Sequence, residues 1–192
     1  MKTRIKICCI ASPEEARQAI NHGASAVGLV SAMPSGPGVI SETLIAEIAE
    51  SAPPGIATVL LTSQQTASGI IDQQKRCRTN TIQICDELLE GTYVEMRESM
   101  PGIKLMQVIH VVDESSVDEA VTISEQVDAI LLDSGNPNLS VKELGGTGRV
   151  HNWSLSRLII DSVRKPVFLA GGLNPGNVKK AIEAVRPFGV DL

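Results

Sequence analysis

The chain has 192 residues, of which 43% are hydrophobic and 20% charged, and its formal net charge at pH 7 is -5. This length fits one domain with a sizeable core over residues 1–192, and it disfavours two domains. The acidic balance and an aromatic content of 2% exclude a nucleic-acid surface, which needs a basic stripe and stacking rings. Any bound phosphate must therefore be held by local groups.

Short apolar segments recur along the chain and are predicted strands. In chain order they are Arg4–Cys8, Ala26–Val30, Ile56–Leu61, Thr81–Ile84, Ile103–Val112, Val127–Leu132, Pro166–Ala170 and Gly189–Leu192. The first alternates, so that Lys6 and Cys8 share one face. The sixth is nearly continuous in apolar residues, which is typical of a parallel strand covered on both faces.

Amphipathic segments lie between these strands and are predicted helices. Ser12 and Ser41 are the expected N-caps of the first two helices, and Asn152 is expected to begin the sixth. For the seventh helix we expect Asn174 as N-cap with Pro175 at the first helical position. The fourth helix is expected to contain four anchors, Leu88, Leu89, Tyr93 and Met96.

This alternation predicts parallel strands joined by right-handed crossovers. Eight strands favour a closed α/β barrel, the (β/α)8 TIM barrel, over a doubly wound open sheet, and no G-x-G-x-x-G motif follows the first strand. The sequence stops at the eighth strand, so the expected barrel is incomplete at the C-terminus and lacks the last helix. In such a barrel the working residues lie at the carboxyl ends of the strands.

The four cysteines have no metal-ligand spacing, and only three histidines are available to help them, so no metal site is expected. Reduced thiols are the default for such a pattern. The first ten residues lack the apolar core of a signal peptide, and no run approaches the ~20 apolar residues that span a bilayer. We therefore expect a cytoplasmic protein that does not bind membranes.

Candidate site residues follow from the strand ends. Cys8 ends the first strand and Asp133 the sixth, while glycine-rich segments after the sixth and seventh strands can bring backbone N–H groups close to an anion. Lys6 is expected to form a structural ion pair with Asp191. The residues alone leave two interpretations open, since a strand-end aspartate is often a loop cap and a cysteine is usually a small buried hydrophobe.

Four motifs occur in order along nearly the whole chain. They are Lys6-Ile7-Cys8, Leu131-Leu132-Asp133-Ser134, Gly145-Gly146-Thr147-Gly148 with Trp153 behind it, and Ala170-Gly171-Gly172-Leu173-Asn174-Pro175. This series resembles the phosphoribosylanthranilate isomerase family, the third-step barrel of tryptophan biosynthesis.

The resemblance implies an Amadori rearrangement, in which an aldosylamine ring opens and its C2 proton is moved to give an aminoketose. This chemistry needs an acid for the ring oxygen and a base for C2. By the family pattern Asp133 is the acid and Cys8, as thiolate, the base. The pattern also implies a phosphate site made of Gly145, Gly146, Thr147, Gly148, Gly171 and Gly172. The implied partner is a small phosphorylated sugar amine, with no cofactor, and the expected assembly is a monomer or a homodimer.

The sequence departs from the family pattern at four places. Cys9 stands where the family has glycine, Gly38 replaces an arginine that grasps the anthranilate carboxylate, and Cys85 replaces a histidine. The fourth departure is the end of the chain at Leu192, before a Ser-Gly phosphate turn and a final helix. Losing a bidentate Arg–carboxylate contact costs about 1.5 to 3 kcal/mol, which is enough to change the preferred substrate.

Three hypotheses therefore remain. The first is the isomerase acting on its usual anthranilate substrate. The second is a paralogous isomerase acting on another phosphoribosylamine. The third is a non-catalytic phosphate-binding barrel.

Overall fold

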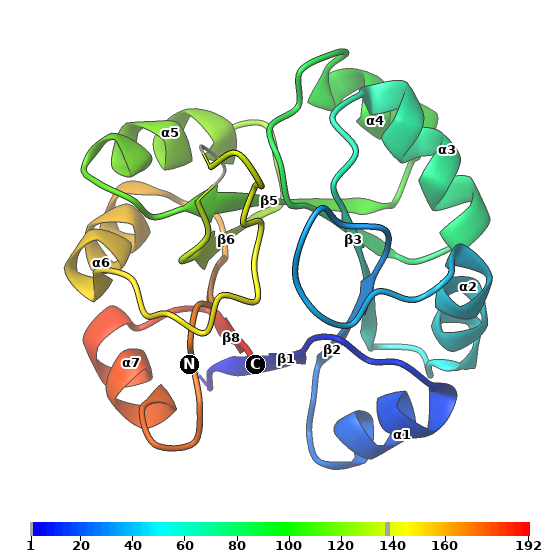
Figure 1. The fold of residues 1–192 in the computed structure, drawn as a ribbon, viewed down its shortest axis with the longest axis horizontal. Helices are drawn as coiled ribbons and strands as arrows, with labels where there is room; N and C mark the ends of the chain where they lie inside the picture. Colours follow the sequence, from blue (N-terminus) through cyan, green and yellow to red (C-terminus); the bar gives the residue numbers. More distant parts are fainter. Residues whose placement is uncertain (1, 137–138) are drawn as a thin grey trace.

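The computed structural model describes residues 2–136 and 139–192. Eight parallel strands form a closed barrel in which each strand pairs with the next along the chain and the last pairs with the first. Figure 1 shows the barrel with a ring of helices around it. The predicted α/β barrel is confirmed.

The strands lie where the apolar segments predict them, with small differences at their ends. They are β1 (Arg4–Ile7), β2 (Ala26–Val30), β3 (Ala57–Thr62), β4 (Thr81–Ile84), β5 (Lys104–His110), β6 (Ala129–Asp133), β7 (Val167–Leu169) and β8 (Gly189–Asp191). Cys8 therefore lies directly after β1. β5 ends two residues before the predicted Val112, because pairing with β6 stops at His110 opposite Asp133.

Seven helices occur in the described part of the chain, one after each of the first seven strands. They are α1 (Pro13–Asn21), α2 (Glu42–Ser51), α3 (Ala67–Cys77), α4 (Tyr93–Ser99), α5 (Ser115–Ser124), α6 (Trp153–Ser162) and α7 (Val178–Val185). The predicted N-caps of α1, α2 and α6 are confirmed: the side chains of Ser12, Ser41 and Asn152 accept backbone N–H groups of the first turn.

Two predicted helix starts are wrong. Leu88 and Leu89 lie in the loop before α4, which begins after the N-cap Thr92, whose side chain accepts the Glu95 N–H at 3.1 Å. α7 begins at Val178, not at Pro175, because the Asn174 side chain accepts the Gly176 N–H and holds residues 174–177 in a turn. Local side-chain hydrogen bonds of this kind compete with the helix.

The core has an inner and an outer part, divided by the strand alternation. On β6, Ala129 and Leu131 belong to the cluster inside the barrel, whereas Ile130 and Leu132 pack outward against the helices. Because successive side chains of a strand point to opposite faces, Asp133 at the end of β6 points inward. The fold thus delivers a carboxyl group to the mouth of the barrel.

Candidate active site

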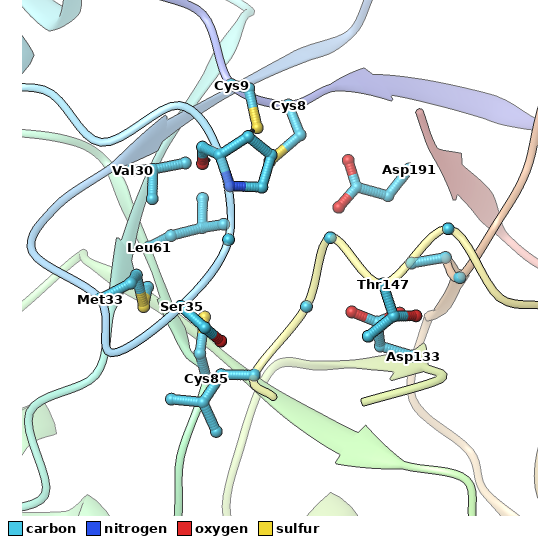
Figure 2. Close-up of a pocket in the computed structure, with 18 of the residues that line it drawn as sticks. Cys8, Cys9, Val30, Met33, Ser35, Leu61, Cys85, Asp133, Thr147 and Asp191 are labelled. Atoms are coloured by element: carbon cyan, nitrogen blue, oxygen red, sulfur yellow. Dashed lines mark hydrogen bonds between the residues drawn. The ribbon is translucent and has the colours of Figure 1, made fainter. Parts of the chain in front are cut away.

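A cavity of about 380 Å³ lies at the mouth of the barrel, where the carboxyl ends of the strands meet. All predicted site residues line it, namely Cys8, Asp133, Gly145, Gly146, Thr147, Gly148, Gly171 and Gly172. Figure 2 shows Cys8 and Asp133 facing this space from different sides. The closed barrel brings together groups that lie far apart in the sequence.

Cys8 is held by the junction of the first and last strands. Its backbone N–H donates to the carbonyl of Leu192 at 2.8 Å. Beneath it, Gly28 of β2 leaves room for two side chains, since a Cβ at that position would lie 3.0 Å from both Cys8 Sγ and Lys6 Nζ. An ammonium group therefore lies close to the candidate base.

Lys6 and Asp191 form the predicted ion pair inside the barrel. Lys6 Nζ lies 2.7 Å from Asp191 Oδ2, and the lysine side chain is fully buried. Burial is the largest single influence on the pKa of Lys6 and lowers it, but Asp191, Cys8 and Cys85 together outweigh burial and the pKa is raised. Lys6 therefore stays charged and supplies a fixed positive charge below Cys8.

Cys9 has a left-handed backbone, with φ at 58°. Its side chain also lines the cavity, and its Sγ lies 3.7 Å from the Pro37 carbonyl oxygen. A Cβ at Gly38 would lie 2.6 Å from Cys9 Cβ, which leaves no room for a larger residue there. Cys9, which stands where the family pattern has glycine, therefore fills a tight place between β1 and the loop that contains Gly38.

Asp133 is 8% exposed, and one of its oxygens is fixed. Oδ1 accepts the Ser134 N–H at 2.7 Å, while Oδ2 lies 3.0 Å from the position that a Cβ at Gly145 would take. Burial raises the pKa of Asp133, although the Ser134 N–H and His110 oppose the shift. A raised pKa favours the protonated form that a general acid needs.

The two glycine segments pack backbone against backbone. A Cβ at Gly172 would lie 2.7 Å from the carbonyl carbon and oxygen of Arg149 and 2.8 Å from the Gly148 carbonyl oxygen, so only glycine fits there. The Ser134 and Thr147 hydroxyls, which lie 2.8 Å apart, add a side-chain link between β6 and the first segment. This packing builds a single glycine-rich wall on one side of the cavity.

Two asparagines after β7 position this wall, and the sequence analysis gave Asn174 only the role of a helix N-cap. The Asn177 side-chain amide donates to the Gly172 carbonyl at 2.9 Å, and the Asn174 amide donates to the same oxygen at 3.3 Å. Arg149 directly follows the first glycine segment, but it pairs with Glu143 on the surface, and its side chain is 58% exposed. The asparagines of the G-G-x-N-x-x-N pattern are a signal that could have identified these contacts.

Two loops meet over the mouth of the barrel, one between β2 and α2 and the other between β6 and α6 (Figure 1). The Ser35 hydroxyl donates to the Lys142 carbonyl at 2.7 Å, and Pro37 packs against Gly146. Lys142 Nζ in turn binds Asp86 Oδ2 at 2.7 Å, beyond the end of β4. The sequence analysis missed this cover, which links three loops that are distant along the chain.

Within the described residues, no group of three or more His, Cys, Asp and Glu side chains is arranged to hold a metal ion. In the same part of the chain, none of the helices has the length and apolar character to cross a bilayer.

The family model for N-(5'-phosphoribosyl)anthranilate (PRA) isomerase matches residues 5–192. The isomerase of Methanocella arvoryzae is 35% identical over 190 residues, which cover 99% of this chain and 87% of the relative. Isomerase 2 of Methanosarcina mazei is 35% identical over 189 residues, covering 98% of this chain and 83% of the relative. The similarity therefore extends along nearly the whole chain.

Solved structures agree with this result. The Thermotoga maritima phosphoribosylanthranilate isomerase superposes with a TM-score of 0.79 at 31% identity, covering 99% of this chain and 87% of that one. A phosphoribosylanthranilate isomerase in complex with reduced 1-(o-carboxyphenylamino)-1-deoxyribulose 5-phosphate gives a TM-score of 0.77 at 29% identity, covering 100% of this chain and 87% of that one. The chain belongs to the N-(5'-phosphoribosyl)anthranilate isomerase family.

Proposed function

We propose that this chain catalyses the Amadori rearrangement of N-(5-phosphoribosyl)anthranilate to the 1-deoxyribulose 5-phosphate product, a step of tryptophan biosynthesis. The protein is an aldose-ketose isomerase by family. One observation supports the assignment most directly: Cys8 and Asp133 face one cavity whose wall carries the two glycine segments. That arrangement offers a base, an acid and backbone amides to a single small substrate.

Asp133 is the proposed general acid. Its protonated carboxyl donates a proton to the ring oxygen, which breaks the bond between C1 and that oxygen and leaves a Schiff base at C1. The burial that raises its pKa supports this role, because an exposed aspartate is ionised at neutral pH. Oδ1 accepts the Ser134 N–H, so Oδ2, which lies against Gly145, is the proposed proton donor.

Cys8 is the proposed general base, acting as a thiolate on the proton at C2. Lys6 supports this role, since its buried ammonium lies next to Cys8 and stabilises the negative charge on sulfur. Cys85 also lines the cavity, but burial raises the pKa of its thiol to about 12, so it stays protonated. Cys9 and burial also raise the pKa of the Cys8 thiol, while Lys6 opposes that shift, so the proposal for Cys8 rests on its position at the end of β1 beside the Lys6 ammonium.

The substrate phosphate is proposed to bind at the glycine-rich wall. Both glycine segments line the cavity at neighbouring strand ends, with residues 145–148 following β6 and residues 171–172 following β7. Backbone amides bind an anion without a nearby lysine or arginine, and the Thr147 hydroxyl adds a further polar contact. The covered mouth then holds the sugar between this wall and Cys8.

The test is turnover of N-(5-phosphoribosyl)anthranilate by the wild type, Cys8→Ala and Asp133→Asn. Each variant is expected to lose about 10² to 10⁴-fold in kcat, the usual contribution of a positioned acid or base. Cys77→Ala and Asp161→Asn are matched controls, since Cys77 lies on α3 and Asp161 on the outer surface of α6, and neither lines the cavity. Activity that survives both site variants would favour the non-catalytic barrel.

A second candidate is the same rearrangement on another phosphoribosylamine. Gly38 favours it, because a glycine in place of the arginine of the family pattern offers no cation to an anthranilate carboxylate, and Cys9 leaves no room there for a larger side chain. Turnover of a panel of phosphoribosylamines decides between the two candidates. A structure with a reduced aminoketose-phosphate analogue would show which side chains contact the amine group.

The proposed setting is the cytoplasm, where the four free thiols, Cys8, Cys9, Cys77 and Cys85, stay reduced. The proposed partner is a small phosphorylated sugar amine. We further propose that the protein acts as a monomer or a homodimer, and a solved structure of monomers generated from the dimeric Thermotoga maritima enzyme offers a precedent for both forms. Light scattering of the purified chain tests the assembly.

A further inference from the structure

The cavity at the mouth of the barrel has two unlike sides. Figure 2 shows Asp133 and Thr147 on one side, where the glycine-rich wall also lies. The opposite side is apolar and is lined by Val30, Met33, Leu61 and Cys85. A sugar phosphate held at the glycine-rich wall therefore directs its amine part toward the apolar side.

The anthranilate group carries a carboxylate, and the cavity lining offers no charge to balance it. In the described part of the chain, the lining residues include no lysine, arginine or histidine, and the carboxyl groups among them are those of Asp133 and Asp191. A carboxylate placed against an apolar surface without a partner is costly, because it loses its hydration. The anthranilate carboxylate therefore needs a cation from just outside the lining.

Basic side chains around the cavity differ in their positions. Lys6 is fully buried inside the barrel below Cys8, where it pairs with Asp191. Arg149 packs its backbone against Gly172 and so lies on the phosphate side. Neither of them is placed to meet the amine part of the substrate.

His110 approaches Cys85, but its ring is occupied. Its Nε2 lies 3.1 Å from the Cys85 carbonyl oxygen. Its Nδ1 packs against Gly135, since a Cβ at that position would lie 2.5 Å from it. The histidine is therefore not available to the substrate.

Lys142 is anchored beside the apolar side at both of its ends. Its backbone carbonyl accepts the hydroxyl of Ser35, which lines the cavity. Its Nζ lies 2.7 Å from Asp86 Oδ2, and Asp86 directly follows Cys85. Cys85 lines both the cavity at the mouth and the neighbouring cavity that contains Lys142, so it forms a boundary between the two. The ammonium of Lys142 thus lies just beyond the apolar side.

We propose that Lys142 is a specificity-determining residue whose ammonium pairs with the carboxylate of the anthranilate group. The proposal rests on the proposed function, which supplies that group. An ammonium has three donors and Asp86 accepts one, so Lys142 can bind the substrate and keep Asp86. The Lys142 side chain is 36% exposed and that of Asp86 only 5%, so the lysine is the partner that is free to turn past Cys85.

The test compares N-(5-phosphoribosyl)anthranilate with N-(5-phosphoribosyl)aniline, which lacks only the carboxylate. The measured quantity is the ratio of the two kcat/KM values in the wild type and in Lys142→Met. We expect this ratio to fall about five- to tenfold in the variant, because a half-exposed ammonium contributes less than a buried one. A purely structural role would lower both kcat/KM values together and leave the ratio unchanged.

Two further variants define the role of the charge. Lys142→Arg keeps a cation at this position and is expected to restore most of the wild-type ratio. Lys75→Met is a matched control, because Lys75 also pairs with an aspartate, Asp72, but lies on α3 and does not line the cavity. It should leave the ratio unchanged.

Binding of a reduced aminoketose-phosphate analogue, with and without the carboxylate, gives a readout that needs no turnover. By calorimetry, we expect the wild type to bind the form with the carboxylate about five- to tenfold more tightly. Lys142→Met is expected to bind both forms equally.

Two results would overturn the assignment of Lys142: a wild type that does not distinguish the two forms of the analogue, or a Lys142→Met variant that keeps the wild-type ratio in either measurement. If the analogues bind as expected but the wild type turns over neither substrate, the proposed function fails and the carboxylate contact stands.

Discussion

Gly38 and Cys9 pack so closely in the mouth of the barrel that they should be energetically coupled. A Cβ added at Gly38 would lie 2.6 Å from Cys9 Cβ and 2.8 Å from Cys9 Sγ, and Gly38 has a φ of 82°. The left-handed φ costs Gly38→Ala about 1 to 2 kcal/mol. The overlap with Cys9 adds about 1 to 3 kcal/mol, the usual cost of overpacking.

In a Cys9→Gly background the overlapping side-chain atoms are gone, and what remains is the cost of the φ angle together with a 3.0 Å contact to the backbone Cα of residue 9. The two substitutions should therefore show a coupling of about 1 to 3 kcal/mol in unfolding free energy, measured by urea denaturation of the wild type, both single variants and the double variant. Gly23→Ala is a matched control, because Gly23 has a φ of 97° but nothing within 4 Å of an added Cβ. It should cost the same φ term and show no coupling to Cys9.

Additivity within about 0.5 kcal/mol would refute this reasoning. The same contact affects Gly38→Arg, the variant that would put back the arginine of the family pattern. In the wild type an arginine at position 38 meets the Cys9 side chain, so a fair test of an arginine that contacts the substrate needs Cys9→Gly as well.

Three further predictions concern charged groups. The pKa of Asp133 is raised in the folded protein. Its protonated carboxyl therefore stabilises the fold below the unfolded pKa of about 3.9, and this stabilisation is lost as the pH rises through the folded pKa. Asp133→Asn should therefore be at least as stable as the wild type at pH 7. Urea midpoints at about pH 7 and pH 4 check it, and a variant less stable at pH 7 would contradict it. Asp191→Asn should lower the unfolding free energy by about 3 to 5 kcal/mol, since it leaves the Lys6 ammonium buried without a counter-charge. A change below about 1 kcal/mol would contradict this and show that water reaches Lys6. Lys142→Met leaves the buried Asp86 carboxylate without its partner and should raise KM severalfold and lower the unfolding free energy by about 1 to 3 kcal/mol. Steady-state kinetics and urea denaturation check this, and an unchanged KM would contradict it.

The sequence alone determined the fold and the position of the site in it. The apolar segment Ala26–Val30 coincides with β2, because a parallel strand covered on both faces is rich in apolar residues throughout. Thr81–Ile84 coincides with β4, where Ile82 and Ile84 pack against the helices and alternate with the polar Thr81 and Gln83. Strand alternation and the rule that working residues lie at the carboxyl ends were enough to place Cys8 and Asp133 at one mouth. The ion pair between Lys6 and Asp191 followed from the same alternation.

Only the tertiary structure decided how the site is finished. The left-handed backbone at Cys9, its contact with Gly38 and the bridge from Lys142 to Asp86 join segments that are distant in the sequence. Periodicity reports which face of an element is buried, whereas these features depend on which atoms of other segments occupy the remaining space. That information exists only once the barrel has closed.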